Sequence, residues 1–463
     1  MIKMRCAIAI VALTGLTLTC LAQDNGEGGG VLPPATDNNM VFFPEARQWT
    51  LKECLDYAEQ HSLEIERAKA QAKQAKVDVM QSKGEWLPSL SASTSHSVQY
   101  QPFLEDITGV DIEKVNYSGS YGVNSSWTIY NGNQTANNIR LAKLAAEQSE
   151  LQSEKLMNTI REQATQLYVQ ILYTREALKV NRELLQQDKT LYSRGEELLK
   201  QGQIAKYELL ELQTQVANGE YDIVNTETQI EQYMLQMRDL INLPDEEPFD
   251  IASVEISDQQ AQAVIPPTET VYQQALSTRP EVRDADLAIR QSELSYSVAK
   301  AGYLPTIDLT AGLGSNHSTV TDSDFFTQMK RSFDASVGVR VTMPILDNRR
   351  TKAAKQKADI ARTIARIDKA DMESVLYYDI ATYRLQAVNN QQKFNSGLTR
   401  LKYNKENYNA IYEKARIGTM NIVETLNART LLLNAQQDVL QSKFLTIFNM
   451  QMLRLYGGEP LTI

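Results

Sequence analysis

The chain of 463 residues carries 47 Lys and Arg against 57 Asp and Glu, which gives a formal net charge of −10. An acidic chain lacks the basic face that binding to nucleic-acid phosphates requires, so nucleic acid is excluded as a partner. A chain of this length would ordinarily hold about two to four domains.

The first 22 residues are expected to be a signal peptide. Lys3 and Arg5 precede a short apolar run, and small residues lead to Gln23, so cleavage is expected after Ala22. This run is too short for a membrane-spanning helix, and no later apolar run reaches the roughly 20 residues that such a helix needs. If the protein crosses a membrane, it must therefore do so with strands.

Residues 23–48 contain clusters of glycine and proline and are expected to form a flexible segment. Thr19 directly before Cys20 fits a lipid-attachment site poorly, and lipidation of Cys20 is left open. After cleavage Cys54 would be the only cysteine, which excludes an intramolecular disulfide.

A first repeat is expected over residues 49–243. It begins with one helix from Trp49 to Trp86, capped by Thr50 with Glu53 three residues on, and Pro88 ends it. Asn133 to about Lys200 contains no proline and is expected to form a helix on the order of 100 Å long at 1.5 Å per residue. A turn at Gly202 then leads into a segment with a seven-residue apolar period, which is typical of coiled helices. That period is carried by Leu209, Val216, Ile223, Ile230 and Met237.

Between these helices, residues 89–130 are expected to form a β-hairpin. From Tyr117 to Ile129, mostly aromatic, apolar and small residues alternate with mostly polar ones. This alternation places Ile129 on the same face as Trp127. Alternation over about a dozen residues exceeds the usual soluble strand and suits a membrane-spanning one. A polar loop over 102–114 joins the two strands. A soluble hairpin domain is the alternative, but aromatic residues near the strand ends favour a membrane interface.

The second half repeats this plan. Glu208 and Glu424 are 216 residues apart, as are Gly202 and Gly418. Residues 244–267 link the two halves and are expected to pack as an equatorial segment around the helices. The second repeat, residues 268–463, is expected to hold a helix starting near Glu269, a β-hairpin over 306–346 with a polar loop at 320–330, and two long helices. Its seven-residue period is carried by Leu426, Leu433, Leu440 and Ile447.

The four strands of one chain cannot close a barrel, and open sheet edges cannot face lipid because their backbone groups would lack partners. Two copies would give eight strands and an interior filled by side chains, whereas three would give twelve and leave a lumen. The sequence therefore predicts a homotrimeric conduit: a mainly α protein with membrane β-strands, in which a duplicated unit forms a 12-stranded β-barrel continuous with a long α-helical barrel. The resemblance described next implies that this helical barrel is periplasmic.

The sequence resembles the TolC-like outer-membrane efflux proteins over nearly the whole mature chain. The resemblance rests on the repeat, on Leu-Pro before each hairpin, on the stretches 127–132 and 343–348 that end the hairpins, and on the pattern Gly-Thr-Met-Asn-Ile-Val-Glu-Thr-Leu-Asn-Ala over 418–428. It implies a trimer in outer-membrane lipid, extending into the periplasm, that docks to a periplasmic adaptor protein and through it to an inner-membrane pump.

The resemblance also implies site residues. Glu208 and Glu424, with Tyr207 beside the first, stand where the family narrows the periplasmic end, and a ring of carboxylates favours cations in a pore. The alternative is that each glutamate is a solvated coiled-coil residue. Many family members have a second acidic residue at the position of Asn427, and an arginine at the position of Met420 can help to hold the helices closed. Closure of this chain's tip by hydrophobic contacts is therefore kept as an alternative.

Two further assignments complete the expected sites. Gly202 and Gly418 are expected as helix-tip turns that require unusual backbone angles and that meet the adaptor. Asp334 and Arg340 share the polar face of one strand and are expected to face the lumen, either to set selectivity or to form a solvated wall.

Catalysis is not expected. His61, His96 and His317 are the only histidines and belong to three separate sequence contexts, so neither a metal cluster nor a catalytic triad is supported, and no cofactor or metal is expected. The expected function is that of a passive exit duct for small molecules in a tripartite efflux system. A type I protein-secretion duct, or a periplasmic coiled-coil adaptor or scaffold without a pore, remains the alternative.

Overall fold

The computed structural model describes residues 47–100, 115–244, 248–254, 256–417 and 421–461. The expected signal peptide, most of the expected flexible segment, the loop at 102–114, Gly418 and Met420 lie outside these residues. Within them, no helix is long and apolar enough to cross a membrane.

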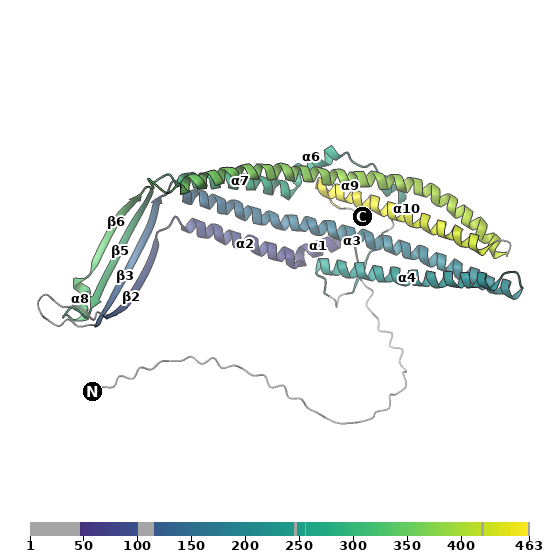
Figure 1. Ribbon diagram of the computed structural model, residues 1–463, viewed down its shortest axis with the longest axis horizontal. Helices are drawn as coiled ribbons and strands as arrows, with labels where there is room; N and C mark the ends of the chain where they lie inside the picture. The colour runs from purple at the N-terminus through teal and green to yellow at the C-terminus, as the bar shows by residue number, and fades with distance from the viewer. Residues whose placement is uncertain (1–46, 101–114, 245–247, 255, 418–420, 462–463) are drawn as a thin grey trace, which may run out of the picture. The chain divides into compact units, whose positions relative to one another are not determined.

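Four strands form one antiparallel sheet in the order β2-β3-β5-β6 (Figure 1). They are β2 (Ser89–Tyr100), β3 (Val115–Tyr130), β5 (Thr306–Ser318) and β6 (Asp334–Thr342). β3 pairs with β5, so the hairpins of the two repeats join in a single sheet, and β2 and β6 are its edges.

The sheet has one apolar and one polar face, because side chains alternate along each strand and the register aligns like with like. The apolar face carries Leu90, Ala92, Val98, Tyr117, Tyr121, Val123, Trp127, Leu309, Ala311, Leu313, Ala335, Val337 and Val339. The polar face carries the serines of β2 with Asn124, Thr128, Asp308, Thr310, Asp334, Ser336 and Arg340.

The expectation that Ile129 continues the Trp127 face is wrong. The pairing passes from Thr128 opposite Asp308 to Tyr130 opposite Ile307, so Ile129 is the extra residue of a β-bulge. A bulge removes one residue from the ladder and shifts the alternation after it. Sequence alternation alone cannot reveal such an insertion.

The single helix expected from Trp49 to Trp86 is also wrong, because Ser62 divides it into α1 (Leu51–His61) and α2 (Leu63–Gly84). Ser62 has an extended backbone, and its hydroxyl accepts a hydrogen bond from the backbone N–H of Ile65 at 3.5 Å, as an N-cap does. The second repeat has the same break at Arg279, 217 residues later, between α6 (Thr268–Thr278) and α7 (Pro280–Ala301). There Pro280 disfavours a helical backbone for the residue before it.

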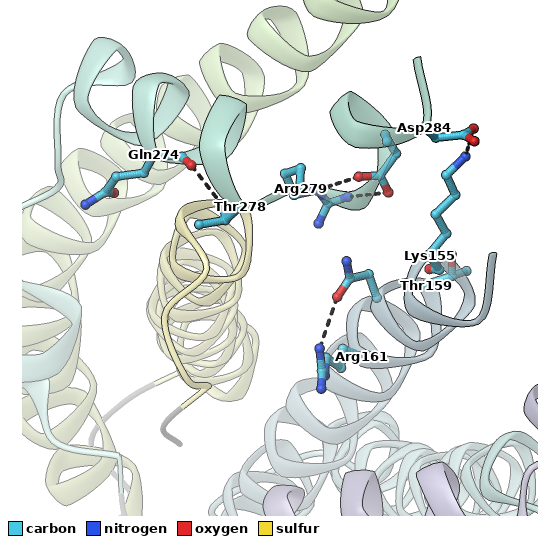
Figure 2. Close-up of polar contacts among 9 residues, drawn as sticks. Lys155, Thr159, Arg161, Gln274, Thr278, Arg279 and Asp284 are labelled. Carbon is cyan, nitrogen blue, oxygen red and sulfur yellow. Dashed lines mark hydrogen bonds and ion pairs between the residues drawn. The ribbon is translucent and has the colours of Figure 1, made fainter. Parts of the chain in front are cut away.

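Figure 2 shows this second break. The Arg279 guanidinium binds the carboxylate of Glu281 through two hydrogen bonds of 2.9 and 3.1 Å. It also lies 4.6 Å from the ring centroid of Tyr456. An ion pair between Lys155 and Asp284 ties α7 to the neighbouring long helix. Charged contacts therefore hold the start of α7 directly after the break.

The long helices match between the repeats. α3 (Gln134–Lys200) and α9 (Arg350–Arg416) each have 67 residues, and α4 (Lys206–Ile241) and α10 (Ile422–Gly457) each have 36. The turns that enter α3 and α9 also match: Gly132 and Asn133 have φ of 68° and 66°, and Asn348 and Arg349 have φ of 52° and 67°. The duplication therefore extends to individual backbone angles.

The core lies where α1, α3 and α4 meet the short parallel strands β1 (Arg47–Trp49) and β4 (Phe249–Ile251). Its buried residues include Cys54, Tyr168, Ile171, Met237 and Ile251. Burial raises the pKa of the Cys54 thiol to about 12, so this cysteine is an inert core residue.

Regular structure occurs in three segments expected to be a flexible segment, a linker and a loop. The last two residues of the segment expected to be flexible, 47 and 48, belong to β1. The linker over 244–267 contributes β4 and a short helix, α5 (Asp258–Ala261). The loop expected at 320–330 contains most of α8 (Phe325–Arg331), whose N-terminus is capped by Asp324.

Candidate functional site

The helix tips are the connections at 201–205, between α3 and α4, and at 417–421, between α9 and α10. Gly202 has φ of +71°, and a Cβ at this position would meet no atom within 4 Å. Its N–H donates to the carbonyl of Leu199 at 2.9 Å, and the N–H of Gln203 donates to Leu198 at 2.9 Å. Gly202 is thus a helix-ending residue in the left-handed conformation that glycine favours. Its expected equivalent, Gly418, lies outside the described residues.

Glu208 and Glu424 occupy the third position of α4 and α10, where the helix dipole favours a negative charge. Their surroundings differ. The Glu208 carboxylate accepts a hydrogen bond from the backbone N–H of Ala205 at 2.8 Å and so caps its helix, and the residue is half-buried. Glu424 is exposed and forms no hydrogen bond or ion pair with the residues that the structure describes.

Tyr207 and Asn427 lie beside these glutamates. The Tyr207 side chain is 61% exposed, and Asn427 is exposed on α10. Two acidic and two neutral polar side chains of each chain are therefore accessible just beyond the tips.

A hydrophobic cluster holds the two hairpins of long helices together behind the tips. Its buried members are Leu191, Leu212, Ala415 and Ile422, and Tyr192, Ile204, Tyr412 and Leu426 pack against them. These side chains come from all four long helices. The contacts that join the tips within one chain are thus partly apolar.

A buried ion pair lies deeper in the same bundle. Arg429 of α10 contacts both carboxylate oxygens of Asp188 on α3, at 2.8 Å from Nε and 2.7 Å from Nη2. The amide oxygen of Gln215 on α4, in the orientation that satisfies its neighbours, accepts from Nη1 of Arg429 at 2.9 Å. Burial raises the pKa of Asp188, and Arg429 opposes this shift. This contact links the two repeats.

Sequence reasoning missed Asp188 and Arg429, although a signal was present. Asp188 stands four residues after Leu184 and three before Leu191, at a step that is otherwise apolar. Arg429 stands three residues before Leu432 on the buried side of α10. A charged residue at a core-facing helix position in each repeat indicates that the two residues form a buried ion pair, because burying an unpaired charge costs too much free energy.

Asp334 and Arg340 both lie on the polar face of the sheet and are exposed. Arg340 stands opposite Asp308 of β5, which accepts a hydrogen bond from the Thr128 hydroxyl at 2.7 Å. The polar face therefore carries charges of both signs. The structure places these two residues far along the chain from the tips, so the expected sites form two separate regions.

Two of the three histidines, which stand in separate contexts along the sequence, are brought together by the sheet. His96 of β2 and His317 of β5 both pair with Gly119 of β3 and therefore flank one residue. β2 and β5 are not neighbours in the sequence, and only the β3–β5 pairing brings these side chains together.

Two edge helices expose apolar stripes. α9 packs against α7 and α10, and α4 packs against α3. Residues of the α9 stripe are between 51% and 69% exposed, and those of the α4 stripe between 49% and 67%. The α9 stripe is Ile360, Ile364, Ile367, Tyr378 and Leu385, and the α4 stripe is Leu210, Tyr221, Val224 and Leu235. Apolar side chains exposed along one helix make that helix a candidate interaction surface.

Comparison with known proteins agrees with these features. The family model described as outer membrane efflux protein matches residues 54–243 and 271–454. The chain is 22% identical over 349 residues to the pyoverdine export outer membrane protein OpmQ of Pseudomonas putida, and the match covers 71% of each protein.

Solved outer-membrane channels share the fold. The Campylobacter jejuni CmeC channel superposes with a TM-score of 0.73 at 19% identity, covering 89% of this chain and 87% of that one. VceC of Vibrio cholerae superposes with a TM-score of 0.74 at 14% identity, covering 88% and 96%. The family model matches most of the length of the chain, and the fold agrees with that match. The chain belongs to the outer membrane efflux protein family.

Proposed function

We propose that three copies of this chain form the outer-membrane exit duct of a tripartite efflux system. Small molecules would enter at the helix tips and leave through a barrel of twelve strands. An inner-membrane pump would supply the energy through a periplasmic adaptor that docks at the tips, around Gly202 and Gly418. Export by a signal peptide would place the helices in the periplasm.

The single observation that carries this proposal is the two-faced open sheet. Its edges, β2 and β6, leave backbone groups without strand partners, and lipid does not tolerate such edges. Its apolar face suits lipid, and its polar face, with Asp334 and Arg340, suits a watery lumen. Pairing of β6 of one copy with β2 of the next would satisfy the edges and close the barrel.

The edge helices support the same assembly. In a closed ring the apolar stripe of α9 would be covered by the next copy, as would that of α4. Within each stripe, neighbouring residues are separated by three, four, seven or eleven positions, steps that return to one side of a helix with 3.6 residues per turn. Burial of these stripes would give the assembly a hydrophobic driving force.

At the tips, we assign different roles to the two glutamates. Glu424, exposed and without a described partner, would supply a ring of three carboxylates that attracts cations. Glu208 would contribute charge to the same region while its main contact caps α4. Closure would depend on the apolar cluster behind the tips and on the Asp188–Arg429 pair.

A small-molecule cargo is favoured because a relative is named for pyoverdine export. The test is a deletion strain, complemented by the intact chain and assayed in parallel for sensitivity to toxic small molecules and for secretion of exported proteins. We expect increased sensitivity with normal secretion. Loss of protein secretion with unchanged sensitivity would instead support a secretion duct, and no change in either would contradict an exit duct.

A further inference from the structure

The short helix α8 lies against the apolar face of the sheet, at the end remote from the long helices (Figure 1). The Phe325 ring lies edge-on to the rings of His317 and Tyr121, with centroid distances of 4.9 and 6.2 Å. His317 and Tyr121 stand on the apolar face, because they alternate along their strands with its residues Leu313 and Val123. Phe325 therefore holds α8 on the face of the sheet that suits lipid.

Hydrogen bonds fasten α8 to the end of β5. The side-chain carbonyl of Gln328 accepts from the backbone N–H of Ser318 at 2.8 Å. The backbone carbonyl of Met329 accepts from the hydroxyl of Ser315, also at 2.8 Å. The protein itself thus sets the position of α8, so its outward side chains are presented before any partner binds.

The outward side of α8 combines an apolar ring with positive charge. Phe326 is 76% exposed, and Lys330 stands four residues later, on the same side of the helix. Lys330 and Arg331 are exposed, and neither has an ion-pair partner among the residues that the structure describes. The helix itself contains no acidic residue. Asp324 caps its opposite end, and Asp334 belongs to the polar face of the sheet.

The depth of α8 matches the edge of a bilayer. Ser315 stands nine residues after Thr306, the first residue of β5 next to the helices. This span is about 30 Å along the strand at roughly 3.3 Å per residue, and about 23 Å in height at a tilt of about 40°. The apolar band of an outer-membrane barrel is about 25 Å tall. The rings of Tyr100 and Phe333, at the same end of the sheet, are also exposed, as interfacial aromatic residues are.

We propose that α8 is an interfacial anchor that binds the phosphate groups of an anionic lipid in the outer leaflet. The Phe326 ring would enter the boundary between headgroups and acyl chains. Lys330 and Arg331 would contact phosphate oxygens, and the planar guanidinium of Arg331 suits paired hydrogen bonds to one phosphate. The site rests on the proposed barrel, which sets the face and the leaflet, and it adds the chemical class of lipid that the barrel binds.

The experiment measures binding of fluorescently labelled lipid A, a lipid with phosphate groups in its headgroup, to the full chain in a neutral detergent. We expect saturable binding that neither phosphatidylcholine nor inorganic phosphate displaces. Lys330→Gln and Arg331→Gln should each weaken binding roughly fivefold, because one basic residue near an anionic lipid surface contributes about 1 kcal/mol. The double variant should weaken binding more than either single variant. Phe326→Ser should also weaken it, without changing the oligomeric state.

Lys402→Gln combined with Lys405→Gln is the matched control. Both lysines are exposed on α9, in the part of the chain that packs against α10 rather than in the sheet. The charge change equals that of the double variant in α8. Lipid A binding should be unchanged in this control, and circular dichroism should show that all variants fold.

Unchanged binding in the double variant of Lys330 and Arg331 would overturn the proposal. So would an equal loss in the lysine control, displacement of lipid A by inorganic phosphate, or no binding by the intact chain. Native mass spectrometry of the same samples reports assembly separately. Monomers that bind lipid A through Lys330 and Arg331 would contradict the proposed trimer but support the lipid site. Loss of trimers in Phe326→Ser with unchanged lipid binding would instead assign α8 to contact with a neighbouring copy.

Discussion

Arg429 on α10 and Asp188 on α3 form a buried ion pair that joins the two repeats near the helix tips, with 8% and 4% of their side chains exposed. Arg400 and Asp438 form another pair of the same types, but both are 54% exposed and both belong to the second repeat. The first pair crosses between hairpins and the second does not. This difference allows the contribution of the buried pair to be measured against a matched control.

Arg429→Leu should destabilise the packing between the two repeats, because it leaves the Asp188 carboxylate buried without its partner. Removal of one member of a buried pair typically costs about 3–5 kcal/mol. Thermal unfolding followed by circular dichroism should show a lower midpoint, and conductance in planar bilayers should rise. Arg400→Leu should change stability by only about 0–1 kcal/mol, as expected for an exposed pair. Equal effects of the two variants would contradict the assignment.

Gly202→Ala should destabilise the α3–α4 tip by about 1 kcal/mol, because an L-residue is strained at φ of +71°. Gly84→Ala is the control, since Cβ atoms at both positions meet open space and only Gly202 has a positive φ. Gly84 ends α2, where alanine should be neutral or stabilising. Denaturant unfolding measures both. A loss of stability in Gly84→Ala as large as in Gly202→Ala would rule out backbone strain as the cause.

Glu424→Gln should reduce cation preference in bilayer conductance without lowering thermal stability, because Glu424 is exposed and has no described partner. Glu208→Ala should instead lower stability by about 0.5–2 kcal/mol, the usual range for the loss of a helix cap. Reversal potentials in a salt gradient report the first effect, and thermal unfolding reports the second. If the double variant Glu208→Ala, Glu424→Gln keeps the same cation selectivity, the two glutamates do not line the pore.

Alkaline pH should unfold the helical part. Burial raises the pKa of Tyr168 and Tyr456 to about 12 each, and it also raises the pKa of Tyr383 and Tyr408. Unfolded tyrosines titrate near their ordinary value of 10.0, so from pH 10 upward the unfolded chain releases protons that the folded chain retains. The free energy of unfolding should therefore be steady below about pH 10 and fall towards pH 12.

Tyr168→Phe tests this origin, because it removes one of the titrating hydroxyls and its 3.3 Å hydrogen bond to Ala252. The decline of stability with pH should be shallower by about 1.4 kcal/mol per pH unit, the value for one proton. Helical circular dichroism during chemical unfolding at several pH values supplies the measurement. An unchanged slope would show that Tyr168 already ionises in the folded state.

Much of the fold could be predicted because the sequence carries two distinct periods. Strict alternation through Val337 and Val339 indicates a strand with one apolar face, and the repeated seven-residue step through Leu426 and Leu433 indicates packed helices. Equivalent residues such as Glu208 and Glu424 are separated by a constant offset, so an element predicted in one repeat is also predicted in the other. Periodicity is local, which is why one sequence suffices to read it.

The missed features depend on contacts that periodicity does not contain. Ser62 interrupts an otherwise helical pattern without a proline or glycine, and only its cap to Ile65 explains the break. The bulge at Ile129 is visible only against the register of β5. His96 and His317 are 221 residues apart and meet because both flank β3. Long-range pairing of this kind cannot be deduced from spacing along the chain.

The central claim is that one chain leaves its sheet and its edge helices incomplete and that further copies complete them. Native mass spectrometry of the detergent-extracted protein tests this most directly. The account predicts an assembly of three chains that persists at dilution. A stable monomer, folded and soluble without detergent while the edges of β2 and β6 remain unpaired, would contradict it.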